Sequence, residues 1–384
     1  MNLKKSIFLI GLAWALFLSF PFLFFLNKNL AYYAYKEVTY RVIINHLIGK
    51  EKKEEKIAST LLDYFYYDLF TPTGAQVIDK DLYNDLMRGI AWCDQRSLGI
   101  GTFLGKVGIG NRIVITRNPN GISNHTISEV LIEKKWVALD PTLGLLIRDG
   151  EGKLLSYMDI CKEPSLFYLS PKMFMLKEIN PQKYGKVKES FTTNIFYNSP
   201  SEPTIWSNPI KTKDLKRKVI TGLLDFYINI FKDTFSYIYQ DIYLVFYSPF
   251  KENERIYFKA RNYDLYNRYT LAEDLYREFI LRFPEDNRTE KARFLLGLLE
   301  NKNKNFELSI STLEMLLKKY PNTKWKRIAI YYLGYNYELL KNYELAKDYY
   351  WKAIYLYNEL SQDDLKPGEL KAVKRLYDIL NLKK

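Results

Sequence analysis

The chain has 384 residues, of which 47% are hydrophobic and 26% are charged, and its formal net charge is +13. This composition excludes a largely disordered protein and allows two or three domains with cores of their own. The lysines are interleaved with acidic residues and accompany no recognition motif, so nucleic acid is not an expected partner. Two cysteines exclude a disulfide framework.

A long apolar run opens the chain. Ile7 to Leu26 holds 20 residues without a charge, which is enough to cross a hydrocarbon core of about 30 Å as a helix. A cleaved signal peptide is the alternative, but Phe22 to Leu26 offers no small-residue cleavage site. We therefore predict an uncleaved anchor in residues 1–30. Lys4 and Lys5 precede the run and basic residues also follow it, so the flanking charges do not decide its orientation. The signal-like layout favours an extracytoplasmic position for the bulk of the chain.

Two helices are expected after the anchor. Apolar residues recur every four positions over residues 52–69, which predicts an amphipathic helix. Pro72 and Gly74 end this helix, and a second one is expected over residues 81–90.

Cys93 stands where a third helix should begin, since residues 94–106 have helical character and Gly108 follows them. A thiol at a helix N-terminus faces the positive end of the helix dipole and amides without intrahelical acceptors, which favours the thiolate. A single cysteine is more often a small buried apolar residue, so the position becomes informative only with its partners.

His125 and Asp140 flank a predicted β-hairpin. Residues 126–132 and 136–139 predict its two strands, with a turn over residues 133–135, and Pro141 ends the second strand. Antiparallel pairing brings both ends of such a hairpin close together. An aspartate that accepts from one imidazole nitrogen leaves the other nitrogen to deprotonate a thiol, so the pair predicts a base and its orienting carboxylate.

The segments around these residues resemble the transglutaminase-like superfamily. The matching segments are Gly89-Ile90-Ala91-Trp92-Cys93-Asp94-Gln95, Leu104 with Gly108-Ile109-Gly110-Asn111-Arg112-Ile113-Val114, His125 with Glu129-Val130, and Trp136-Val137-Ala138-Leu139-Asp140-Pro141. The Cys-to-His interval of 32 residues and the His-to-Asp interval of 15 both suit that family. Gly110-Asn111 stands where the family often has Pro-Ala.

The resemblance implies a papain-like α+β domain over about residues 31–205. It implies that Cys93 is the nucleophile, His125 the general base and acid, and Asp140 the orienter, with an amide of a protein or peptide as substrate. No cofactor is expected. A metal site at the same three residues lacks the usual ligand spacing, and no dense acidic cluster suggests a calcium-regulated crosslinker.

Residues 171–209 hold scattered Pro, Asn, Ser and Lys, which predicts an irregular domain edge and a linker. A long amphipathic helix is expected over residues 214–247, within a connecting region of residues 206–253. Its charged residues argue against a second membrane span, so we expect it to pack between domains or, as the alternative, to lie on a membrane.

The last third is repetitive. Aromatic residues, small residues, glycines and prolines each recur at an interval of 37 residues. The repeated positions are Tyr269, Phe306 and Tyr343 (aromatic), Ala272, Ser309 and Ala346 (small), Gly297 and Gly334, and Pro284 and Pro321. This arrangement resembles the tetratricopeptide repeat, whose usual period is about 34 residues. We predict an all-α solenoid over residues 254–384, closed by a capping helix over residues 368–382.

These features together predict a membrane-anchored thiol enzyme acting on amide bonds, whose helical repeats recruit a protein partner. The other hypothesis is a membrane-tethered scaffold without catalytic activity that binds proteins through both domains. The sequence specifies neither the substrate nor whether water or an amine accepts the acyl group.

Overall fold

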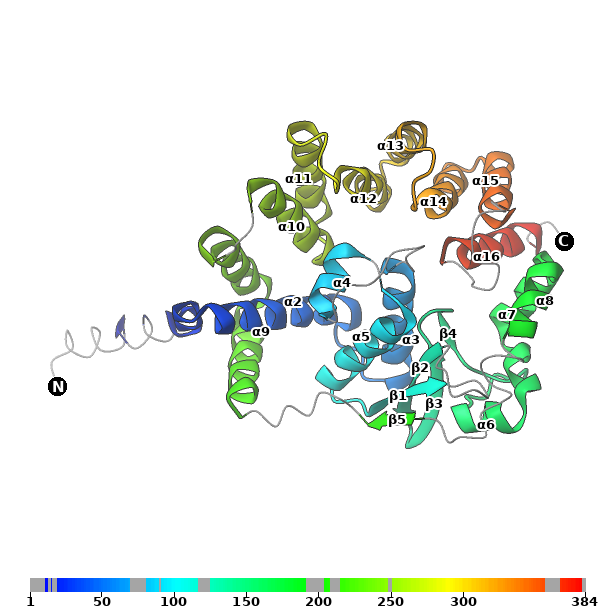
Figure 1. The fold of residues 1–384 in the computed structure, drawn as a ribbon, viewed down its shortest axis with the longest axis horizontal. Helices are drawn as coiled ribbons and strands as arrows, with labels where there is room; N and C mark the ends of the chain where they lie inside the picture. Colours follow the sequence, from blue (N-terminus) through cyan, green and yellow to red (C-terminus); the bar gives the residue numbers. More distant parts are fainter. Residues whose placement is uncertain are drawn as a thin grey trace. The chain divides into compact units, whose positions relative to one another are not determined.

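The computed structural model describes residues 11–12, 15, 19–69, 81–89, 91–116, 125–190, 204–207, 215–247, 251–355 and 367–381 (Figure 1). Its contacts divide the chain into two compact units. Unit 1 comprises Met1–His46 and Lys211–Leu275, and unit 2 comprises Leu47–Ile210 and Tyr276–Lys384. The sequence predicts that residues 31–46 belong to the middle domain, whereas the contacts place them in one unit with the long helix that follows residue 214.

Unit 1 is helical. It contains η1 (Phe20–Leu26), α2 (Lys28–Ile48), α9 (Leu215–Ile242), a π-helical turn η4 (Tyr243–Tyr247), α10 (Glu252–Leu265) and the first half of α11 (Tyr269–Arg282). Buried polar side chains join these helices. Thr39 Oγ1 accepts from Gln240 Nε2 at 2.8 Å, and Tyr35 Oη accepts from Asn262 Nδ2 at 2.7 Å. Because these partners lie about two hundred residues apart, no local pattern in the sequence indicated this unit.

The predicted anchor lies mostly outside the described residues. Within the part of the chain that the structure describes, no helix is long and apolar enough to cross a membrane. The last residues of the apolar run form η1, which packs on α9. The rings of Phe22 and Phe25 stack against Tyr239 with centroid separations of 6.0 and 4.7 Å.

The centre of unit 2 is an antiparallel sheet with strand order β4-β3-β2-β1-β5 (Figure 1). Its strands are β1 (Asn111–Thr116), β2 (His125–Ile132), β3 (Lys135–Asp140), β4 (Leu145–Leu146) and β5 (Thr204–Ser207). The helices α3 (Glu54–Asp68) and α5 (Cys93–Lys106) contact it, and α4 (Leu82–Arg88) packs on α5. The expected hairpin is present, with Ser128 opposite Leu139, but its turn is tighter than expected because only Glu133 and Lys134 adopt positive φ.

The region expected to be an irregular edge contains helices instead. They are α6 (Tyr157–Lys162), η2 (Pro164–Leu169), α7 (Pro171–Ile179) and α8 (Pro181–Ser190). Three of them begin with proline. Proline is well suited to the first helical position, because its fixed φ is already helical and that position needs no N–H donor. The prolines therefore mark helix starts here and do not mark loops.

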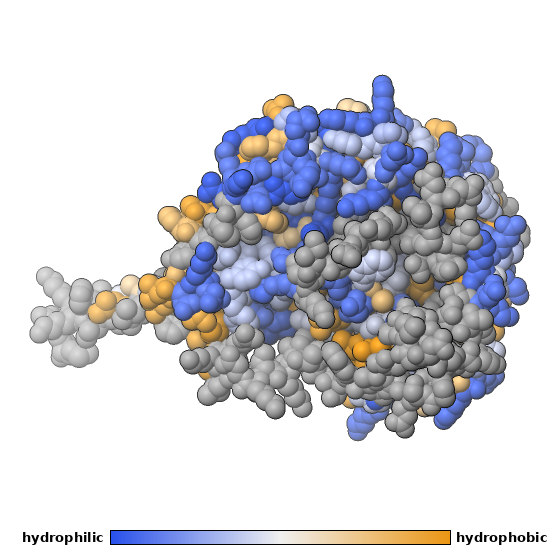
Figure 2. Space-filling model, viewed as in Figure 1, coloured by the Kyte–Doolittle hydropathy of each residue, from blue (hydrophilic) through white to orange (hydrophobic). Residues whose placement is uncertain are grey.

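The repeats form antiparallel helix pairs. They comprise α12 (Thr289–Lys302), α13 (Phe306–Lys319), α14 (Lys326–Leu339) and α15 (Tyr343–Tyr355), followed by α16 (Pro367–Asn381). The 37-residue interval marks the points of closest approach. A Cβ atom at Gly297 would meet the Leu313 side chain at 2.7 Å, and one at Gly334 would meet Tyr350 at 2.8 Å. Figure 2 shows mainly hydrophilic residues over the repeats on the face that it draws.

Candidate functional site

Cys93 is the first residue of α5, and its thiol is partly exposed. The start of the helix is fixed by Gln95, whose Oε1 accepts from the backbone N–H of Trp92 at 2.9 Å. The Gln95 amide group in turn donates to Asp85 Oδ1 at 3.1 Å. These contacts hold the first turn of α5 in a defined place, and a first-turn amide has no acceptor within its own helix.

His125 and Asp140 form a buried pair at the open end of the hairpin. His125 Nε2 lies 2.7 Å from Asp140 Oδ2. The other carboxylate oxygen, Oδ1, accepts from the backbone N–H groups of Thr142 at 2.8 Å and Leu143 at 3.1 Å. Asp140 is fully buried, so the turn that follows β3 supplies the hydrogen bonds that water would otherwise provide.

The imidazole also contacts the thiol. Burial alone lowers the pKa of His125, but attraction and hydrogen bonding by Asp140, together with a hydrogen bond and attraction from Cys93, raise that pKa well above its usual range. Since Nε2 faces Asp140, Nδ1 is the nitrogen left for the thiol. The imidazolium form is therefore favoured between a carboxylate on one side and sulfur on the other.

The structure thus brings all three sequence-predicted residues together. A carboxylate, an imidazole and a thiol in series can move a proton from sulfur to nitrogen and keep it there. Cys93 and Cys161 are both free thiols. Burial raises the pKa of Cys161. A hydrogen bond with Tyr157 lowers this pKa, and the carboxylate of Glu129 raises it further.

Arg96 is a supporting residue that the sequence analysis missed. It lies on α5 one turn after Cys93, and none of its surface is exposed. Its guanidinium donates to the carbonyls of Pro141 at 3.3 Å, Thr142 at 3.4 Å and Leu69 at 2.5 Å. The cation therefore ties the helix that carries the thiol to the turn whose amides hold Asp140. In the sequence, its place within a glycine-rich, apolar helix was the only indication that this arginine is buried.

An ion pair with a buried carboxylate joins β1 to β2, the strand that begins at His125. Arg112 of β1 lies 2.6 Å from Glu129 of β2, and the same carboxylate accepts from the Tyr157 N–H of α6 at 2.9 Å. The Arg112 guanidinium also lies 4.2 Å from the centroid of the Trp136 ring on β3. Three strands and a helix are joined at this point, which restrains the hairpin that carries His125 and Asp140.

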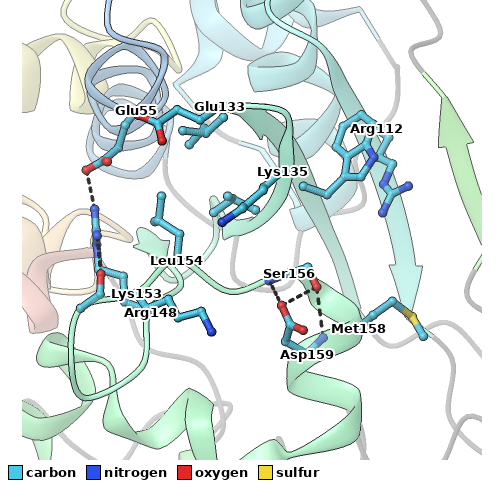
Figure 3. Close-up of a pocket in the computed structure, with 14 residues that line it drawn as sticks. Glu55, Arg112, Glu133, Lys135, Arg148, Lys153, Leu154, Ser156, Met158 and Asp159 are labelled. Atoms are coloured by element: carbon cyan, nitrogen blue, oxygen red, sulfur yellow. Dashed lines mark hydrogen bonds and ion pairs between the residues drawn. The ribbon is translucent and has the colours of Figure 1, made fainter.

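A separate hollow of about 750 Å³ lies at the turn end of the hairpin (Figure 3). Glu55 and Arg148 form an ion pair of 2.5 Å at its edge, and Asp159 accepts from Ser156 Oγ at 2.7 Å. Along β3, Lys135 at this hollow lies roughly 17 Å from Asp140, and Val137, which also lines it, lies roughly 10 Å away. Since none of the three predicted residues lines it, the candidate site remains at the open end. Among the described residues no group of three or more His, Cys, Asp or Glu side chains could hold a metal ion.

The comparisons with known proteins bear on the repeats. Residues 291–323 match the tetratricopeptide repeat family, and they span most of α12 and all of α13. The chain therefore contains a tetratricopeptide repeat there, and repeats of this kind suggest interaction with another protein. A search of curated proteins finds no match.

Proposed function

We propose that this protein is a transglutaminase-like thiol enzyme that acts on amide bonds of a protein or peptide. The observation that carries the proposal is that His125 hydrogen-bonds to Asp140 through Nε2 and also contacts the Cys93 thiol. Chain order, spacing and the strand–helix arrangement agree with the papain-like core that the resemblance implies. The proposal thus rests on contacts as well as on the likeness of short sequence segments.

In the proposed reaction the Cys93 thiol gives its proton to His125, and the sulfur attacks the carbonyl carbon of the amide. The new C–S bond makes a tetrahedral oxyanion, which the first-turn amide of α5 stabilises. The imidazolium then donates its proton to the nitrogen as the C–N bond breaks, and an amine leaves. A thioester on Cys93 remains. Water or a second amine, deprotonated by His125, attacks the thioester carbon. The C–S bond then breaks, the sulfur takes the proton back from His125, and the acyl group leaves as a carboxylic acid or a new amide.

The proposal assigns recruitment of a protein partner to the repeats. Two contacts join these repeats to the domain that holds the candidate site. Lys291 of α12 donates to the carbonyls of Met87 and Arg88 at the end of α4, and α16 packs on α7. A partner bound by the repeats would therefore be held at a fixed distance from Cys93.

The proposal also includes membrane attachment through residues 1–30 and an extracytoplasmic position for the bulk of the chain. The uncharged run from Ile7 to Leu26 supports it, since its length suits a hydrocarbon core. Retention of the full-length protein in the membrane pellet after alkaline carbonate washing is the expected result. A soluble form beginning near Ala31 would contradict it.

A thiol-directed electrophile tests the enzymatic part. Full-length protein should be alkylated by iodoacetamide at Cys93 much faster than at Cys161, as measured by peptide mass spectrometry. His125→Ala should remove that difference while leaving the thermal unfolding transition in place. Equal labelling of both cysteines in the unmodified protein would favour a scaffold without catalytic activity.

A further inference from the structure

The long helix α9 has one face inside unit 1 and another outside it. Leu224, Tyr227, Phe235 and Tyr239 are buried on the inner side. The Phe235 ring lies 6.4 Å from that of Phe22 in η1, and the Tyr239 ring lies 4.7 Å from that of Phe25, so aromatic contacts hold the helix against its own unit.

The outer side of α9 carries an apolar stripe. We define the stripe as the exposed residues Val219, Phe226, Ile230 and Ile238. Their exposure runs from 48% to 53%. They follow one another at spacings of 7, 4 and 8 residues, which confines them to roughly 120° of the helix circumference. Large apolar side chains gathered along one helix face mark an interaction surface, whereas scattered single ones do not.

The N-terminal segment packs on the inner side of α9. The apolar run that begins at Ile7 ends in η1, and η1 contacts Phe235 and Tyr239 through Phe22 and Phe25. A membrane that holds the run therefore lies next to unit 1. Leu23 and Leu26, which belong to the same run, are themselves exposed.

The sequence is basic just before α9 and over its first residues. Lys211, Lys213, Lys216, Arg217 and Lys218 fall within eight residues, with Asp214 as the acidic residue among them. An amphipathic helix with a basic end and an apolar face binds at the interface of a bilayer that contains anionic lipid. A helix of 28 residues is about 42 Å long, so the stripe would rest on the bilayer along several turns.

We propose that α9 lies in the plane of the membrane interface, with the stripe buried in an anionic lipid surface. This inference rests on the membrane attachment proposed above and is independent of the chemistry at Cys93. The arrangement would hold unit 1 against the bilayer by two elements, the N-terminal run and α9, and would thereby restrict its orientation.

The test uses full-length protein that carries Cys93→Ser and Cys161→Ser, reconstituted in vesicles of phosphatidylcholine and phosphatidylglycerol. Single cysteines at Ile230 and Ile238 of the stripe, and at the neighbouring exposed Asn229 as control, receive an environment-sensitive nitrobenzoxadiazole label. We expect blue-shifted emission at Ile230→Cys and Ile238→Cys that a lipid-borne quencher reduces several-fold. The label at Asn229→Cys should be quenched much less.

Each other outcome counts against the inference. Equal quenching at all three positions would indicate a helix surrounded by lipid, and absence of quenching in carbonate-resistant protein would overturn the inference while leaving the anchor intact. Blue-shifted emission that the lipid quencher leaves unchanged would assign the stripe to a protein contact. Loss of the protein from the vesicles under carbonate would instead remove the membrane attachment itself.

Discussion

Replacing Asp140 by asparagine changes one proton position and almost no volume. The carbonyl oxygen of the introduced side-chain amide must keep facing the backbone N–H groups of Thr142 and Leu143, because an NH₂ group there would meet two donors. The NH₂ group then faces His125 Nε2. Since NH₂ only donates, Nε2 must accept, and the imidazole carries its proton on Nδ1, which is the nitrogen that should accept from the thiol.

Two effects follow from Asp140→Asn, and both reduce the reactivity of Cys93. Burial lowers the pKa of His125 and the carboxylate raises it, so removing the carboxylate lowers that pKa and the imidazolium is lost at a lower pH. Without the imidazolium, the thiol loses the cation beside it that favours attack by sulfur, so alkylation of Cys93 should slow. Turnover of an amide should fall further, on the order of 10⁴-fold, because the base has the wrong tautomer.

The assay is the rate of iodoacetamide alkylation against pH, measured in a Cys161→Ser background. The variant should react more slowly than the unmodified protein at neutral pH, because His125 loses its proton at a lower pH. Asp140→Ala serves as the contrasting variant, because it leaves the two turn amides without their acceptor and should cost about 2–5 kcal/mol of stability. An Asp140→Asn protein that alkylates at the original rate with an unchanged pH profile would refute the reasoning.

Further predictions concern the supports of the site and the repeats. Arg96→Met should slow alkylation of Cys93 and lower the free energy of unfolding by about 3–5 kcal/mol. Arg96→Lys should recover part of the rate and part of the stability. A Met variant with the original rate and stability would exclude the positioning role of Arg96. Gly334→Ala should destabilise the repeats by about 1–3 kcal/mol in denaturant unfolding. Gly185→Ala is the control, because a Cβ there meets nothing within 4 Å, and it should not destabilise the protein. Equal effects of the two substitutions would contradict the close helix contact at Gly334. Cys161 should be alkylated slowly until alkaline pH, because burial raises its pKa, and early labelling would show that its surroundings differ from those described.

The local elements of the site could be predicted because their signals are local. Cys93 begins α5 and His125 begins β2, as helix-start and hairpin patterns indicated. The hydrogen bond between His125 and Asp140 follows from hairpin pairing, which needs only the strand pattern and a turn. The 37-residue interval likewise predicted the helix pairs, because Gly297 and Gly334 lie where two helices touch.

The remaining features depend on contacts between distant residues. Arg96 reads as a surface residue in sequence, and its burial becomes intelligible only when the carbonyls of Leu69, Pro141 and Thr142 surround it. The grouping of α2 with α9 and α10 rests in the same way on Thr39 and Tyr35, whose partners lie about two hundred residues onward. No periodicity encodes such pairs, because each partner only has to be of the right size and polarity.

Under the proposed function, the contact between α12 and α4 would influence how the repeats select a substrate. A flexible linker would let a recruited partner sample many positions, and the effective concentration at Cys93 would then vary weakly with linker length. Here Lys291 donates to the last carbonyls of α4, and Gly89 in a left-handed conformation leads from that helix toward Cys93. The repeats and the candidate site therefore share one compact unit. Selection under this arrangement depends on the distance between the segment that the repeats bind and the amide that reacts, so lengthening or shortening that spacer in a substrate should reduce turnover more than binding.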